Sequence, residues 1–362
     1  MPMIPLVDVK AQYAPLIPEL KERFGEVLAS GRFILGPNVS AFEEEAAAYL
    51  GVPTTIGVGN GTDAIVLVLR AMGIEPGDEV ICPSFTFYAT AEAIVQAGAT
   101  PVFADIDPAT LNLDPEDVAA RITPRTKAIM PVHLFGRPAP LTELAALGVP
   151  IVEDAAQAFG AEGIATTGAA STFSFFPTKN LFALGDGGLV AATDTELGER
   201  VRMLRFHGSR DKKDFHLIGF NSRLDEVQAA ALRLFLPRLD GWNGSRREAA
   251  ARYAALGLGD VCEPPVDDGR HVFHMYVVRS PERDRMAEAL TGAGISSASY
   301  YVTPLHLQPA LGFLGWEPGS LPETERAARE NLALPMWAGI DEATQERVVS
   351  VVRDSVAVGA AR

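Results

Sequence analysis

The sequence predicts an α/β protein of two domains: a large domain with a mainly parallel sheet covered by helices, and a smaller C-terminal α+β domain. Between about residues 50 and 200, short apolar runs alternate with helical stretches, which is the pattern of a parallel sheet. After Trp242 this texture changes. The chain has 362 residues, whereas one domain typically takes ~100–200. We therefore predict domains at 1–240 and 241–362, and the sequence leaves open whether the extreme N-terminus packs with the smaller one.

Each element is expected from its composition and from the residues that end it. Thr54–Val58 is rich in β-branched residues and ends at Gly59, and Glu79–Cys82 is ended by Pro83. Further strands are expected at 100–104, 128–132, 150–152 and 272–278. Helices are expected at 64–72, 88–96, 223–239, 245–258, 283–291 and 341–358, where good helix formers gather. Because ligands of such sheets bind beyond the carboxyl ends of the strands, functional side chains are expected there.

Composition and charge argue against several classes of partner. The net charge is -15 and the pI is about 4.9, and so acidic a surface repels the phosphates of nucleic acids. Cys82 and Cys262 are too few for a metal cage or a secreted disulfide scaffold, which favours a reducing compartment. The first ten residues lack the pattern of a signal peptide, and no run of ~18 apolar residues suits a membrane span. We therefore expect a cytoplasmic protein without a metal, nucleic-acid or membrane partner.

A turn suited to phosphate is the first candidate site. Gly59-Asn-Gly-Thr-Asp63 follows an expected strand and opens an expected helix. Its glycines permit a tight turn, and the first helical amides, near Gly61, Thr62 and Asp63, carry the partial positive charge that binds phosphate. The alternative is a plain strand-to-helix turn with Thr62 or Asp63 as the N-cap.

Asp154 is the second candidate, because it comes just after the apolar strand expected at 150–152. A carboxylate buried at a strand end needs a cation or a strong donor, and a protonated pyridine nitrogen is such a partner. The carboxylate then keeps the ring cationic, so that the ring accepts electrons. Gln157 lies three residues on, on the same face if a helix begins here. The alternative is an Asp that only caps a helix.

Lys179 is the third candidate. It follows the aromatic, strand-like run Ser171–Phe176 and precedes the apolar run Leu181–Leu184. A lysine flanked by apolar sequence is expected to be desolvated, which lowers its pKa and frees the amine as a nucleophile. Ser174 offers a hydroxyl to a phosphate, and the alternative for Lys179 is an amine that stays in solvent. The three candidates each lie at an expected strand end, which favours one shared site over three unrelated features.

Five ordered motifs give the chain a resemblance to a known family. They are GVGNGTDA at 57–64, PSFTF at 83–87, EDAAQ at 153–157, FSFFPTKN at 173–180 and GFNSRLDEVQAA at 219–230. With them, the sequence resembles the DegT/StrS family of sugar aminotransferases from Ile4 to about Pro335. The resemblance implies the fold-type I architecture of enzymes that depend on pyridoxal 5′-phosphate (PLP). It further implies a mainly parallel seven-stranded sheet and a homodimer with shared active sites.

The resemblance assigns the residues around the cofactor ring. Lys179 would carry PLP through a reversible carbon–nitrogen double bond. Asp154 would face the pyridine nitrogen, Gln157 would lie on the side of the ring hydroxyl, and Phe87 would stack on the ring face.

It also assigns residues to the cofactor phosphate and to the substrate. The phosphate would be held by Ser174 and by the backbone amides near Gly61, Thr62 and Asp63. Asn221 would cross the dimer interface to the partner's phosphate. Tyr301 and His306 fall at substrate-facing positions of the family, although a surface or core role suits each nearly as well.

The implied activity is the transfer of an amino group from L-glutamate to a nucleotide-linked keto-deoxysugar, with Lys179 moving the proton between donor and cofactor. A few relatives that remove a hydroxyl from sugars have histidine at this position, so Lys179 favours transamination over dehydration. Gly185-Asp-Gly-Gly188 and Asn221–Asp225 are more similar to enzymes that act on C3 of a dTDP-3-keto-6-deoxyhexose. Amination at C4 remains the alternative.

Three other interpretations remain open. One is another PLP reaction, such as dehydration or racemisation. Another is a non-catalytic sensor that keeps the fold, against which the intact Lys179 and Asp154 weigh. A Rossmann-type nucleotide enzyme is disfavoured, because no Gly-x-Gly-x-x-Gly opens a helix near the start. The basic stretch Arg210–Lys213 suits either a sugar diphosphate or a solvated loop.

Overall fold

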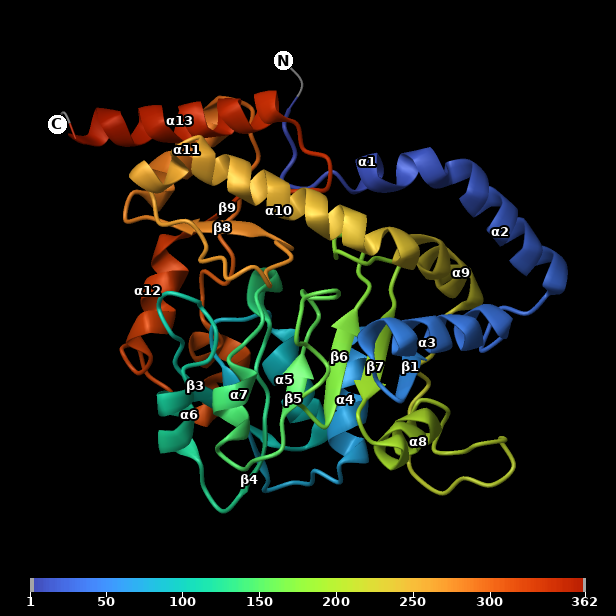
Figure 1. Cartoon of the computed structure of the whole chain (residues 1–362). Coiled ribbons are helices and arrows are strands. Elements are labelled where there is room, and N and C mark those ends of the chain that lie inside the picture. Colours follow the sequence, from blue (N-terminus) through green and yellow to red (C-terminus); the bar gives the residue numbers. More distant parts are fainter. Residues whose placement is uncertain (1–2, 361–362) are drawn as a thin grey trace.

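A continuous sheet of seven strands forms the centre of the large domain (Figure 1) within residues 3–360, which this computed structural model describes. The strands are β1 (Thr54–Val58), β2 (Glu79–Pro83), β3 (Thr100–Ala104), β4 (Thr126–Ile129), β5 (Val152–Asp154), β6 (Ala170–Ser174) and β7 (Gly188–Ala192). Two segments, of order β1-β7-β6-β5 and β3-β2-β4, are joined by parallel bridges from Ile129 to Ile151 and from Val132 to Asp154. Only the pairings of β7 are antiparallel among these strands, so the other six point their carboxyl ends to one edge.

Helices cover both faces of this sheet. Those of the large domain are α1 (Val9–Tyr13), α2 (Ile17–Ser30), α3 (Pro37–Leu50), α4 (Gly61–Ala71), α5 (Ala89–Ala97), α6 (Pro115–Arg121), α7 (Leu141–Ala145), α8 (Thr195–Leu204) and α9 (Glu226–Phe235). One apolar core lies between the sheet and α4, α5 and α8, and a second lies between the sheet and α2, α3 and α9. Strand β7 shows why two cores form: Val190 enters the first, whereas Leu189 and Ala191 enter the second, because side chains alternate across a strand.

The C-terminal part has its own core. Its elements are α10 (Leu239–Ala255), β8 (Tyr276–Arg279), α11 (Arg283–Gly292), α12 (Pro322–Glu330), β9 (Asn331–Leu334) and α13 (Glu342–Ala360). Strands β8 and β9 pair antiparallel, and α10, α11 and α13 pack with them (Figure 1). The chain start lies against this part, because Ile4 bridges to Ile295 and Leu6 accepts a backbone hydrogen bond from Met336. The domain boundary near residue 240 stays a prediction. Between residues 3 and 360, no helix has the length and apolar character that a bilayer crossing needs.

Several expected elements differ from the observed ones. The strands at 54–58 and 100–104 have the predicted bounds, but the predicted strand at 272–278 is wrong in its first half. Residues 272–275 instead form a strap to the large domain, with Val272 N–H donating to Gly136 O at 3.0 Å and Met275 N–H to Phe135 O at 3.3 Å. The helix expected at 245–258 begins at Leu239 and ends at Ala255. In the strap, the backbone hydrogen bonds of Val272 to Gly136 and of Met275 to Phe135 replace the sheet pairing that a strand would need at 272–275.

Candidate active site at the strand ends

The predicted site residues share one edge of the sheet. Asp154 and Ser174 are the last residues of β5 and β6, and Gly61 opens α4 just beyond β1. Phe87 lies between β2 and α5, and Lys179 lies in the loop that follows β6. Because the carboxyl ends of these strands meet at one edge, residues more than a hundred positions apart are brought to a common site.

The start of α4 offers free amides beside Ser174. Asn60 is the N-cap, with its side-chain oxygen accepting from Asp63 N–H at 2.8 Å, so the alternative of Thr62 or Asp63 as the cap is wrong. The cap occupies the Asp63 amide, while the amides of Gly61 and Thr62 have no protein acceptor among the described residues. A Cβ at Gly61 would lie 2.8 Å from the Ser174 Cβ, so these two segments are in close contact. The turn can therefore present two N–H groups and one hydroxyl to an anion.

The pKa of the Lys179 amine is lowered towards neutrality. Burial lowers the pKa of Lys179 to about 8, and the charge of Asp154 partly opposes this shift. The loop is held by the next residue, since Asn180 Nδ2 donates to Val272 O at 2.9 Å and to Asn243 Oδ1 at 2.7 Å. A lysine with a lowered pKa at a strand edge is a candidate nucleophile and proton carrier.

Asp154 is a buried carboxylate that is only partly compensated. It is 5% exposed, accepts from Thr90 Oγ1 at 2.8 Å and from Ala156 N–H at 3.2 Å. Burial raises the pKa of Asp154, although the hydrogen bond from Thr90 acts in the opposite direction. A cation bound next to the Asp154 carboxylate would therefore be strongly stabilised, and it would stabilise the charged form of Asp154 in return.

Gln157 is fixed from two sides. Its Oε1 accepts from Phe135 N–H at 2.7 Å, and its Nε2 donates to the Tyr301 hydroxyl at 3.0 Å. Burial raises the pKa of Tyr301, so its hydroxyl stays protonated at neutral pH. The structure thus brings Tyr301 into this site through Gln157.

Phe87 and Asn221 lie on the surface at the same edge. The Phe87 side chain is 61% exposed, and Asn221 is also exposed. The neighbouring Ser222 accepts from Gly59 N–H at 3.0 Å and donates to Asp63 Oδ2 at 2.5 Å, which ties this segment to the start of α4. This exposure suits both predicted roles, because Phe87 would stack on the cofactor ring and Asn221 would contact the partner subunit.

His306 is buried and has no free ring nitrogen. Its backbone N–H donates to Ser84 Oγ at 2.9 Å, and the same oxygen lies 2.7 Å from His306 Nδ1. Nε2 lies 3.3 Å from Glu325 Oε1, and because a carboxylate only accepts, Nε2 carries the hydrogen of the neutral ring and Nδ1 accepts from the Ser84 hydroxyl. The ring is 2% exposed, and burial lowers the pKa of His306. The predicted substrate contact of His306 would thus require this arrangement to change.

Three residues of the site were not predicted from the sequence. Thr90 bonds to Asp154, and Ser222 bonds to Asp63. His274 is fully buried, and this burial, with the nearby charge of Lys179, lowers the pKa of His274; neither ring nitrogen has a partner among the described residues. Only Ser222 carries a sequence signal, because it follows Asn221 in a recognised motif.

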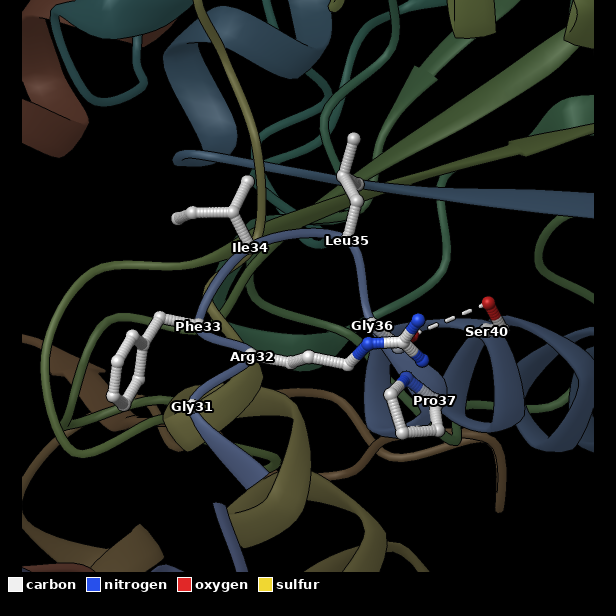
Figure 2. A pocket seen from close by; sticks show the side chains of 8 residues that line it. All are labelled: Gly31, Arg32, Phe33, Ile34, Leu35, Gly36, Pro37 and Ser40. Carbon is white, nitrogen blue, oxygen red and sulfur yellow. Dashed lines mark hydrogen bonds between the residues drawn. The ribbon is translucent and has the colours of Figure 1, made fainter. Parts of the chain in front are cut away.

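The loop between α2 and α3 forms an open pocket (Figure 2). Its residues are Gly31–Pro37 and Ser40, and Phe33 and Ile34 are 48% and 43% exposed. The buried carboxylate of Glu226 holds the loop end, accepting from the backbone N–H groups of Asn38 at 2.9 Å and Val39 at 2.8 Å. Since Glu226 opens α9, the loop is anchored a few residues from Asn221.

Comparisons with known proteins agree with this geometry. Residues 16–353 match the model of the DegT/DnrJ/EryC1/StrS aminotransferase family. A "pleiotropic regulatory protein" of Geobacillus stearothermophilus is 48% identical over 97% of this chain and 98% of the relative. A dTDP-3-amino-3,4,6-trideoxy-alpha-D-glucose transaminase of Streptomyces venezuelae is 44% identical over 98% of this chain and 96% of the relative. A UDP-N-acetyl-3-dehydro-alpha-D-glucosamine 3-aminotransferase of Acidithiobacillus ferrooxidans is 44% identical over 97% of both chains.

Solved structures show the same architecture. The crystal structure of S. venezuelae DesV in complex with a ketimine intermediate superposes with a TM-score of 0.94, at 44% identity and over 98% of both chains. The fold is therefore that of the PLP-dependent transferases of fold-type I. A phosphate-bearing cationic ring suits the free amides of α4, the buried Asp154 carboxylate and a Lys179 amine whose pKa is lowered to about 8. The chain belongs to the DegT/DnrJ/EryC1/StrS aminotransferase family and is a PLP-dependent enzyme.

Proposed function

We propose that this enzyme transfers an amino group from L-glutamate to C3 of a nucleotide-linked keto-deoxysugar of the dTDP-3-keto-6-deoxyhexose class. The observation that carries the proposal is the Lys179 amine, with a pKa of about 8, at the same strand edge as the buried Asp154. The names of the two relatives at 44% identity both place the amino group at C3, one on a dTDP-sugar and one on a UDP-sugar. They support C3 over the alternative of C4.

Each residue has a distinct task in this proposal. Bound PLP supplies a ring that draws off the electron pair left when the donor α-carbon loses its proton. Asp154 holds positive charge at the ring nitrogen, and Thr90 orients the Asp154 carboxylate through its 2.8 Å hydrogen bond. Lys179 Nζ would take the proton from the donor α-carbon and deliver it to the exocyclic carbon of the cofactor, a role that requires a pKa near neutral. Gly61 and Thr62 direct their amides, with the Ser174 hydroxyl, at the phosphate.

The site is proposed to be completed by a second copy of the chain. Exposed apolar side chains gather in segments that border the strand edge, namely Phe33, Ile34, Phe87, Phe176 and Leu184, which are 36–61% exposed. Asn221 lies exposed near the start of α4. We expect size-exclusion chromatography with light scattering to give a dimer, and Asn221→Ala to retain PLP less tightly. A fully active monomer would contradict the shared site.

The sugar nucleotide is proposed to meet the loop before Asn221. Arg210, Lys212 and Lys213 are exposed there, in a protein whose net charge is -15. Because Asp211 and Asp214 lie in the same stretch, these three cations leave a local excess of one positive charge, which favours a diphosphate here over the acidic surface elsewhere. The decisive experiment is a panel of dTDP- and UDP-linked 3- and 4-ketosugars incubated with L-glutamate. Mass spectrometry should detect amination of a 3-ketosugar, and amination of only 4-ketosugars would overturn the regiochemistry.

A regulatory role is the second candidate, because the relative at 48% identity is named a pleiotropic regulatory protein. The arrangement of Lys179, Asp154 and Thr90 counts against a purely regulatory chain, since a scaffold has no need of a lysine with a lowered pKa. Glutamate added to the PLP-loaded protein discriminates between the two. If the absorbance changes to that of the aminated cofactor, the result supports transaminase activity. If the spectrum is unchanged, the result supports a regulatory role.

A further inference from the structure

We infer that Tyr301 is a positioning residue: it fixes the amide of Gln157 and thereby lets the C-terminal part of the chain control how the cofactor is held. This inference rests on the proposed seat of PLP at the strand edge. It replaces a substrate-contacting role for Tyr301 with one exerted through a second side chain.

The hydrogen bonds determine which way the Gln157 amide points. Phe135 offers a backbone N–H, which can only donate, so the group of Gln157 that lies 2.7 Å from it must be the carbonyl oxygen. The Gln157 NH2 group then faces the Tyr301 hydroxyl at 3.0 Å, and that hydroxyl must act as the acceptor. One N–H of Gln157 remains after this bond. Gln157 therefore has one donor left for the ring hydroxyl of PLP, which is expected on its side, and the Tyr301 hydroxyl determines how that donor is oriented.

Both hydrogen-bond partners of Gln157 have an unusual backbone conformation. Phe135 has φ 56° and Tyr301 has φ 57°, in the left-handed region that bulky side chains rarely adopt. Their rings stack at 6.1 Å with planes 9° apart, and Phe85 meets the Tyr301 ring edge-on at 5.5 Å. Both residues with this strained backbone hydrogen-bond to Gln157, which indicates that the position of the Gln157 side chain is constrained, because each strain must be offset by its surroundings.

The two partners of Gln157 come from different parts of the chain. Phe135 precedes β5, whereas Tyr301 lies between α11 and α12, in the C-terminal part. The segment that carries Tyr301 is anchored to the strand edge a few residues later, where Leu305 N–H donates to Ser84 O at 3.0 Å. Tyr301 thus reaches the cofactor seat from outside the central sheet, and only if this segment stays docked.

The test is PLP binding to the cofactor-free chain, which needs no sugar substrate. Tyr301→Phe keeps the ring stack and removes the hydroxyl, and we expect PLP to bind about fivefold more weakly, the effect of one neutral hydrogen bond. Tyr300→Phe is the matched control, because the adjacent Tyr300 packs against the same rings but its hydroxyl makes no hydrogen bond with the described residues. Thermal unfolding of the cofactor-free variants verifies that each is folded.

Two further readouts separate positioning from a merely structural role. In a Gln157→Leu background, Tyr301→Phe should cause no additional loss of PLP affinity, because the two side chains act as a unit. The pH midpoint of the visible absorbance of bound PLP should rise in Tyr301→Phe, since a donor that favours the charged ring oxygen is misplaced. Additive losses, an unmoved midpoint or an equal effect of Tyr300→Phe would overturn the inference. Failure to aminate any ketosugar would refute the proposed reaction and leave these binding results unaffected.

Discussion

The lowered pKa of Lys179 makes a quantitative prediction about covalent attachment of PLP. Only the uncharged amine attacks the aldehyde. With a pKa of about 8, about 9% of the Lys179 amines are uncharged at pH 7, against about 0.03% for the ordinary lysine value of 10.5. Attachment at pH 7 should therefore be about 300-fold faster than for an exposed lysine, and its rate should level off above about pH 8.

The assay mixes cofactor-free protein with PLP between pH 7 and 10 and follows the visible absorbance. Borohydride then traps the adduct, and peptide mapping locates it. Lys179→Ala, measured in parallel, gives the contribution of other lysines, which is subtracted. A rate that still climbs towards pH 10.5, or an adduct on a different lysine, would refute the assignment of Lys179.

Asp154→Asn sharpens this test, because it should change two rates in opposite directions. The Asp154 charge raises the pKa of Lys179 against the effect of burial, so removal of this charge should move the attachment midpoint below about 8. Attachment at pH 7 becomes faster. Turnover should nevertheless fall by orders of magnitude, because the ring nitrogen loses its countercharge. A midpoint that moves upward would contradict the electrostatic account.

The remaining predictions concern neighbouring residues. Thr90→Val removes a donor to the Asp154 carboxylate, a bond worth ~1.5–3 kcal/mol, and kcat should fall at least about tenfold. Glu226→Gln weakens the cap of α3, and urea unfolding should show a free energy of unfolding lower by ~1–2 kcal/mol. Between pH 8 and 10.5 the unfolded cofactor-free chain holds more protons at Lys179 than the folded one, so stability should rise with pH, by on the order of 3 kcal/mol. Urea unfolding of Lys179→Met over the same pH range should lack this rise.

The sequence predicted the strands of the central sheet better than those of the C-terminal part. The strands at 54–58 and 100–104 were found with the predicted bounds, and the first is defined by its β-branched composition and by Gly59, which follows it. The strap at 272–275 has the apolar pattern of a strand, and only its bonds to Phe135 and Gly136 show that it is not one. Local pattern cannot reveal a tertiary partner more than a hundred residues away.

The same limit applies within the site. The common placement of Lys179, Asp154 and Gly61 was predictable, because each lies at or just beyond the end of a strand in a mostly parallel sheet, and that topology gathers strand ends at one edge. Thr90 was not predictable, since a threonine within a helix gives no sign that its hydroxyl meets a carboxylate 64 residues further on. His306 was assigned from its motif to the substrate, yet its two nitrogens lie against Ser84 and Glu325.

The ionisation preferences at the strand edge converge on one kind of ligand. Burial raises the pKa of Asp154 and lowers the pKa of Lys179, so it weakens the charged form of both groups. The attraction between the Asp154 and Lys179 charges opposes the effect of burial, but it is too small to restore the ordinary pKa of either group. A ligand that sets a cation against Asp154 and binds the neutral Lys179 amine relieves both costs at once. An anion alone would pair with Lys179 but leave Asp154 without a cation, and a neutral sugar alone would relieve neither group, so the electrostatics of this edge suit a ligand that is cationic at one end and electrophilic at the other.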